Sequence, residues 1–213
     1  LDQLITEVTA GMESYQLDTA TRPIAGFIDD LSVWYLRRSR DRFKEESADK
    51  TQALATIRFV LHRLALVMAP MAPFYAEHLF QAVRESEDEE STHLATWPST
   101  SHQPTFWRSF FGGNEGRVLL ETMEEVRSLV TQALEAREKA GIKVRQPLAL
   151  LTIPVSSKLP AVFFELIADE VNVKRVEKRG DAVVLDVLIS ESLREEGYVR
   201  DTIREIQAYR KTE

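Results

Sequence analysis

The side chains best suited to chemistry in this sequence are the cations of residues 34–44. This segment holds five cations and one acid, a net charge of +4, in a chain whose total is −7. Cations bind phosphate oxygens, and the two aromatic residues that open the segment supply flat rings beside the charge, a combination that favours nucleic acid. The alternative is a solvated helix face whose arginine stems cover core surface. The predicted contact residues are Trp34, Tyr35, Arg37, Arg38, Arg40, Arg42 and Lys44.

Helical spacing would gather these cations on one surface. Arg37, Arg40 and Lys44 fall at i, i+3 and i+7 on one line, and Arg38 and Arg42 fall at i and i+4 on the neighbouring line. We therefore expect one helix to carry a broad cationic face as far as residue 44. Because the rest of the chain is acidic, with a pI near 5.3, only this surface is expected to bind a polyanion.

Composition excludes several other classes of site. The chain has no cysteine, which rules out disulfides, thiolate zinc sites and cysteine nucleophiles and agrees with a cytoplasmic location. Its four histidines are unpaired, and no glycine-rich phosphate loop or serine elbow is present. No apolar run approaches the ~20 residues that span a membrane. We predict a binding protein without catalytic or metal-ligating residues, and we expect both ends to be cut from a longer chain.

The elements before the cations are predicted to be helical. Residues 4–12 keep helical spacing, and a second helix begins at Asp18 or Thr21 and leads into the cationic segment. Trp34 and Tyr35 continue its apolar stripe, so we interpret them first as anchors of the helix and second as stacking platforms.

The elements after the cations complete a helical bundle over residues 1–98. A third helix is predicted after residues 45–49; Pro70 ends it, and Pro73 starts a fourth. Residues 85–90 contain five acids and no base, which indicates a solvated loop.

The second half of the chain changes its period. Residues 99–116 are predicted to form a packed linker, and residues 117–213 a long helix ending at Gly141 plus a small α+β subdomain. The subdomain reads as strand, helix, strand, strand and closing helix, with a hairpin turn at Gly180-Asp181 and a capping box that begins at Ser192. The predicted fold class is therefore mainly α with a small α+β part.

Several segments together resemble the anticodon-binding domain and C-terminal junction of isoleucyl-tRNA synthetases. Their order along the chain is more specific than any one of them. The matching residues are 20–24, 27–44, 66–77, 91–98, 137–148 and 193–207. Within the second segment, the four arginines of the cationic stretch match the family's Trp-Tyr-x-Arg-Arg-x-Arg element. Lys143 and Arg145 lie in another matching motif and are second candidates for RNA contact; the alternative is a helix C-terminal cation and a strand-edge charge.

The resemblance implies a role for this chain within a larger enzyme. The family activates isoleucine with ATP and Mg²⁺ and attaches it to tRNA, through His-Ile-Gly-His and Lys-Met-Ser-Lys-Ser motifs that this sequence lacks. The chain would bind isoleucine tRNA beside the rest of a monomeric synthetase, would need no cofactor itself, and would be inactive alone. Some members carry a cysteine zinc site, which would be absent here or lie beyond Glu213.

Two alternatives stay open. Valyl, leucyl and methionyl synthetases share the helical bundle, and the isoleucine branch is favoured because residues 37–42 and 141–148 resemble it most. A helical protein-interaction module whose basic face docks an acidic partner belongs to a different class of function. Binding to isoleucine tRNA or to an acidic peptide would separate the two classes.

Overall fold

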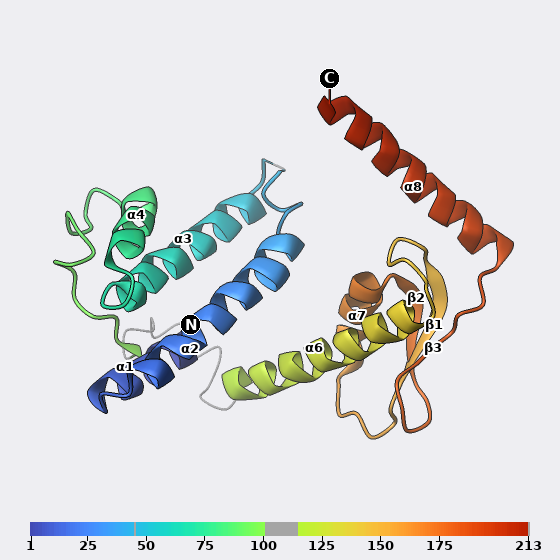
Figure 1. Ribbon diagram of the computed structural model, residues 1–213, viewed down its shortest axis with the longest axis horizontal. Coiled ribbons are helices and arrows are strands. Elements are labelled where there is room, and N and C mark those ends of the chain that lie inside the picture. The colour runs from blue at the N-terminus through green and yellow to red at the C-terminus, as the bar shows by residue number, and fades with distance from the viewer. Residues whose placement is uncertain (45, 101–114, 213) are drawn as a thin grey trace. The chain divides into compact units, whose positions relative to one another are not determined.

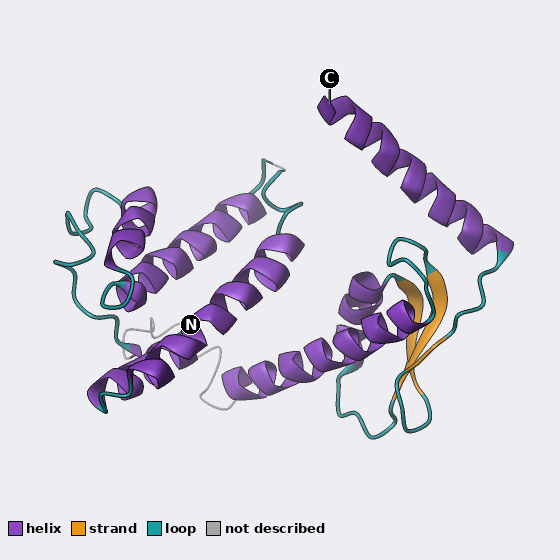
Figure 2. Cartoon of the chain, in the orientation of Figure 1, coloured by secondary structure: helices purple, strands orange, loops and turns teal. Residues whose placement is uncertain are grey.

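The computed structural model describes residues 1–44, 46–100 and 115–212 (Figure 1). The chain divides into two compact units, Leu1–Thr105 and Phe106–Glu213. Most of the predicted linker, residues 101–114, lies outside the described residues, and so do the aromatic residues placed there. The architecture is mainly helical with one small sheet, as the sequence predicted (Figure 2). No helix among the described residues is long and apolar enough to cross a membrane.

The first unit is built from two antiparallel helix pairs. Helices α1 (Asp2–Glu13) and α2 (Leu17–Asp30) form one pair, and α3 (Ala48–Met68) and α4 (Pro73–Val83) form the other. Proline sets the corner of the second pair as predicted, because α3 ends at Met68 and Pro73 is the first residue of α4, where its missing N–H costs nothing. The shared core contains Leu4, Ile5, Val8, Ala20, Ile24, Leu64, Val67, Met68 and Ala76.

The segment that follows α4 is tied to the helices by specific hydrogen bonds. The Trp97 indole donates to the Thr9 hydroxyl of α1 at 3.0 Å. Glu77 of α4 accepts from the Ser91 hydroxyl at 2.8 Å and from the Thr92 backbone N–H at 3.0 Å. These bonds hold residues 84–99 against the bundle.

The second unit covers a three-stranded sheet with helices. The long helix α6 (Glu115–Lys139) ends before Gly141, whose φ of +67° fits the predicted left-handed terminator. Strand β1 (Leu148–Ile153) pairs in parallel with β2 (Val173–Lys178), and the crossover between them carries η3 (Ala161–Phe163) and α7 (Phe164–Val171). Apolar side chains of α6 and α7 and of the sheet make up the core: Val126, Leu129, Val130, Ala133, Leu148, Leu151, Ile153, Ile167, Val171 and Val176.

The predicted hairpin at Gly180-Asp181 is wrong. Strand β3 (Val184–Leu185) pairs with β1 in antiparallel register, Leu151 opposite Leu185, so the sheet order is β2-β1-β3. A two-residue hairpin needs its flanking strands to be neighbours, and here β1 lies between them. Gly180, with φ +70°, instead serves a connection across the end of β1, where its carbonyl accepts from the Val155 N–H at 2.9 Å.

The closing helix α8 (Glu191–Thr212) starts earlier than predicted. Ser190, not Ser192, caps it: the Ser190 hydroxyl accepts from the Leu193 N–H at 3.4 Å. Gly197 lies inside α8 for a steric reason, because a Cβ at this position would come within 2.3 Å of the Gln146 side-chain oxygen. The glycine therefore lets the first turns of α8 approach the segment between α6 and β1.

Candidate nucleic-acid interface

The cationic segment is not one continuous helix, and the expectation of a straight cationic face is wrong. After α2 the backbone forms a π-helix, η1 (Leu31–Leu36), continues helically through residue 38, and turns over residues 39–44. A π-helix bonds each residue to the fifth along the chain, which rotates the following side chains away from the α-helical period. The lines predicted from i, i+3 and i+7 spacing therefore do not form.

The turn of residues 39–44 is anchored by its backbone. Ser39 is buried, its N–H donates to the Tyr35 carbonyl at 2.9 Å, and its carbonyl accepts from the Phe43 N–H at 3.2 Å. Four of the predicted contact residues, Arg37, Arg38, Arg40 and Lys44, are exposed, while Trp34, Tyr35 and Arg42 are partly buried. Arg37 and Arg38 therefore lie at the end of the helical segment, and Arg40, Arg42 and Lys44 lie on the turn that follows it.

Arg42 and Lys44 have carboxylate partners. Arg42 binds Asp49, in the first turn of α3, through two hydrogen bonds of 2.7 Å, and the hydrogen bond from Arg42 lowers the pKa of Asp49 below its usual value. Lys44 lies 2.7 Å from Asp41. Both pairs are exposed to solvent, where ion pairs add little stability and a competing phosphate can replace the carboxylate. Arg40 has no ion pair with any residue that the structure describes.

Trp34 and Tyr35 are neither fully buried, as anchors of the helix would be, nor fully exposed, as stacking platforms would be. Both are partly exposed within η1, and neither belongs to the buried core of the first unit. The hydrogen bond to Asp49 raises the pKa of Arg42, and Tyr35 adds a smaller contribution in the same direction.

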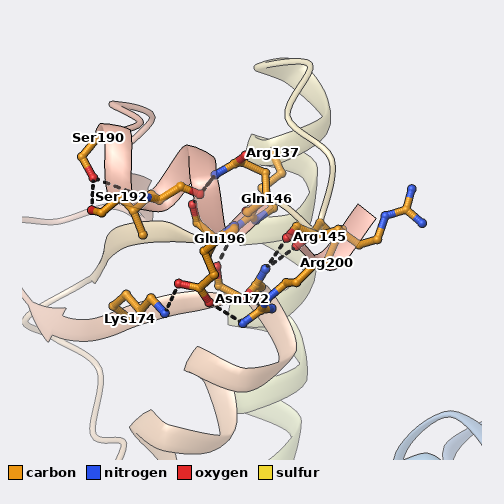
Figure 3. Close-up of polar contacts among 12 residues, drawn as sticks. Arg137, Arg145, Gln146, Asn172, Lys174, Ser190, Ser192, Glu196 and Arg200 are labelled. Atoms are coloured by element: carbon orange, nitrogen blue, oxygen red, sulfur yellow. Dashed lines mark hydrogen bonds and ion pairs between the residues drawn. The ribbon is translucent and has the colours of Figure 1, made fainter. Parts of the chain in front are cut away.

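The second candidate element is the segment of residues 141–147 in the second unit, between α6 and β1. Arg137, near the end of α6, is only 1% exposed and forms hydrogen bonds to this segment (Figure 3). Its guanidinium donates to the carbonyls of Lys143 and Gln146, both at 3.0 Å, and to that of Asn172 at 2.8 Å. Burial lowers the pKa of Arg137, and these carbonyl dipoles take the place of a carboxylate partner.

Asn172 completes the support of this segment. It adopts the left-handed conformation at the end of α7, with φ +55°, and its amide donates to the carbonyls of Val144 at 2.8 Å and Arg145 at 3.1 Å. Carbonyls 143 to 146 are thus all bound by Arg137 or Asn172. Arg200 of α8 donates to the Asn172 side-chain oxygen at 2.9 Å and to Glu196 at 2.7 Å (Figure 3).

The two predicted cations of this segment differ in accessibility. Lys143 is exposed and has no side-chain partner within the described part of the chain. Arg145 is partly buried, and its Nε lies 2.9 Å from the Asp201 carboxylate. Lys143 is therefore the more accessible of the two for an incoming phosphate.

Sequence reasoning did not identify Arg137 and Asn172 as organising residues. A signal was present for each: Arg137 stands at an apolar position of the α6 stripe, and Asn172 lies between a helix and a strand, where asparagine tolerates positive φ. Neither residue takes part in a metal site, and no group of His, Asp and Glu able to hold a metal ion exists among the described residues.

Comparison with known proteins shows which family the chain belongs to. The family model for the anticodon-binding domain of tRNA ligase matches residues 1–152. The chain belongs to this family. The matched residues include α1 to α4, the cationic segment, α6 and the segment of residues 141–147 that Arg137 supports.

Individual relatives agree with this assignment. The chain is 38% identical to isoleucine–tRNA ligase of Thermobifida fusca over 181 residues and 37% identical to that of Thermus thermophilus over 186 residues. A similar protein from Protochlamydia amoebophila is 36% identical over 184 residues. Each comparison covers 83% of this chain but only 16% or 17% of the relative. The chain thus spans about a sixth of the length of these ligases.

Proposed function

We propose that this chain binds isoleucine tRNA through its anticodon arm and positions it for aminoacylation by the rest of a cytoplasmic, monomeric isoleucine–tRNA ligase. The observation that carries the proposal is the cluster of exposed cations at residues 37–44, inside the segment that matches the anticodon-binding domain. ATP and Mg²⁺ act in the absent catalytic part. The chain itself contributes affinity and orientation, needs no cofactor and is inactive alone.

The cations act by binding phosphates rather than by reading bases. Phosphate contacts fix the register of a protein on nucleic acid, and sequence is read from the bases. Arg40 is the first contact in this proposal, and Arg37, Arg38, Arg42 and Lys44 join when a phosphate replaces their present partners, which are Asp49 for Arg42 and Asp41 for Lys44. Each displaced carboxylate stays solvated, so this exchange costs little.

Lys143 is proposed as a separate contact on the second unit. Its backbone carbonyl is held by Arg137, so the chain around it is ordered before RNA arrives. An ordered contact loses less conformational entropy on binding than a mobile one. Replacing Lys143 with Ala should weaken tRNA binding and lower the salt dependence without changing stability.

Titration of the chain with isoleucine tRNA over a range of salt concentrations tests the proposal. Arg40→Ala should lower the slope of log K against log salt by about 0.7 to 0.9, the value expected for one lost phosphate contact. Arg22→Ala is the matched control, because Arg22 is an exposed arginine of the same unit that pairs with Asp18 on α2. Equal slopes for Arg40→Ala, Arg38→Ala and the unsubstituted chain would contradict the proposed interface.

Competition separates the alternatives. Valine, leucine and methionine tRNAs should compete less well than isoleucine tRNA if the chain reads its cognate anticodon. An acidic peptide that displaces all four tRNAs equally at physiological salt would instead support a protein-interaction module.

A further inference from the structure

The first unit contains a hollow beside α3. Its volume is about 700 Å³, within the range of small-molecule pockets, and it opens between α3 and the segment that follows α4. All residues that line it belong to the first unit. The ones that matter here are Arg58, Phe59, His62, Arg63, Glu85 and Asp88.

Phe59 gives this hollow an aromatic wall. Its side chain is 52% exposed, which is unusual for a phenylalanine in a helix that also builds the core. The Arg63 guanidinium lies 4.9 Å from the ring centroid and donates to the Ser99 carbonyl at 3.1 Å. The arginine thus covers part of the ring and is held in place, and the rest of the ring faces the hollow.

The charged groups of the hollow are two arginines, Arg58 and Arg63, and two carboxylates, Glu85 and Asp88. Arg58 forms an ion pair with Glu85, and His62 Nε2 lies 3.5 Å from the Asp88 carboxylate. Burial lowers the pKa of His62, so its ring is neutral near pH 7, and its buried Nε2 has no hydrogen-bond partner among the described residues. The segment 85–90, which the sequence indicated to be a solvated loop, therefore supplies two carboxylates to this wall.

We propose that this hollow binds one unpaired nucleobase of the RNA, stacked on Phe59. The two arginines and two carboxylates of the lining balance in charge, so the hollow does not select a phosphate, and the carboxylates of Glu85 and Asp88 can accept hydrogen bonds from the amino and imino groups of a base. Base stacking on an exposed aromatic ring is the usual way in which proteins hold single-stranded RNA. This proposal rests on the proposed function and assigns one of its base contacts.

The position of the hollow along α3 suits a strand held at residues 37–44. Asp49, which pairs with Arg42, lies in the first turn of α3, and Phe59 follows ten residues later, about 15 Å along the helix axis. Phosphates at the cationic turn and a base in the hollow can therefore belong to one RNA loop. The cations would fix the strand, and the hollow would read a base.

Phe59→Ala tests the stacking contact in the complete 213-residue chain. The probe is a stem-loop RNA with the anticodon arm of an isoleucine tRNA. Binding should weaken about 5- to 150-fold, the loss expected for one stacked base, while the salt slope stays unchanged because no phosphate contact is removed. Phe74→Ala is the matched control: Phe74 is 92% exposed on α4 and does not line the hollow. It should bind like the unsubstituted chain.

A second experiment removes single bases from the RNA. Abasic nucleotides are placed one at a time in the loop, and one of them should weaken binding of the unsubstituted chain as much as Phe59→Ala does. With that RNA, Phe59→Ala should have no further effect, because the two changes remove the same contact. Additive losses at every loop position, or equal affinities of Phe59→Ala and Phe74→Ala, would overturn the nucleobase site alone. Failure of the unsubstituted chain to bind the RNA at low salt would overturn the proposed function together with it.

Discussion

The two candidate RNA-binding elements are held in opposite ways. At residues 39–44 of the first unit, the cations Arg42 and Lys44 are paired with carboxylates at the surface. At residues 141–147 of the second unit, the backbone carbonyls accept hydrogen bonds from polar side chains, among them Arg137, which is almost completely buried. In the first element the charges form surface ion pairs that can exchange, and in the second a buried charge orders the backbone.

The difference separates affinity from stability. Exposed ion pairs add little to the folding free energy, so changes in the cationic turn should alter RNA binding and leave unfolding almost unchanged. Loss of a buried cation that is bound to three carbonyls should instead lower the free energy of unfolding, because it leaves buried polar groups without partners.

The largest effect is expected for Arg137→Met. Methionine fills a similar volume but donates no hydrogen bond, so the carbonyls of Lys143, Gln146 and Asn172 lose their donor. With about 1 to 3 kcal/mol for each buried group left unsatisfied, and partial relief by water, the free energy of unfolding should fall by about 3 kcal/mol. Urea unfolding followed by circular dichroism measures it.

Arg117→Met is the matched control for Arg137→Met. Arg117 lies on the same helix, but its side chain is 71% exposed, and its Nε lies 3.6 Å from the Glu121 carboxylate. Its replacement should change the unfolding free energy by less than about 0.5 kcal/mol. Similar losses for the two variants would show that burial of Arg137 does not order residues 141–147.

A smaller loss is expected for Asn172→Gly. Glycine adopts the observed φ of +55° without strain but removes the amide that binds the carbonyls of Val144 and Arg145. The free energy of unfolding should fall by about 2 kcal/mol. Asn172→Ala should cost roughly 1 kcal/mol more, because alanine is strained at positive φ. If alanine proved the milder change, the left-handed backbone would not be what selects this residue.

The same contrast shows what a sequence can reveal. Pro70, Pro73 and Gly141 act through local backbone constraints, and they predicted the helix ends correctly. The π-helix of Leu31–Leu36 has no such mark, so the cations were placed on an α-helical line that does not exist. The partner of β3 was missed for a related reason: Gly180-Asp181 allows a turn but does not decide which strand lies alongside.

Asp49→Ala should strengthen RNA binding. The change removes the carboxylate that holds Arg42 and leaves the guanidinium available to a phosphate. The slope of log K against log salt should become steeper, by up to about 0.7 to 0.9 if one phosphate contact is gained outright, and stability should barely change. Asp18→Ala, which frees the exposed Arg22 of α2, is the control and should leave the slope as it is. A flat response to Asp49→Ala would mean that Arg42 faces no phosphate.

The smallest effect concerns the titration of Asp49 itself. The hydrogen bond from Arg42 lowers the pKa of Asp49 below its usual 3.8, so the pair stabilises the folded chain above that pH, and this contribution is lost as the pH falls through the lowered pKa. In Arg42→Ala the pKa of Asp49 should rise toward 3.8, which an NMR titration of the side-chain carboxyl carbon measures. Bound RNA should raise it in the same direction, because a phosphate that takes Arg42 releases the carboxylate and adds negative charge beside it. An Asp49 pKa that stays low in the complex would show that Arg42 keeps its carboxylate, and the phosphate contacts would then belong to the other cations of residues 37–44.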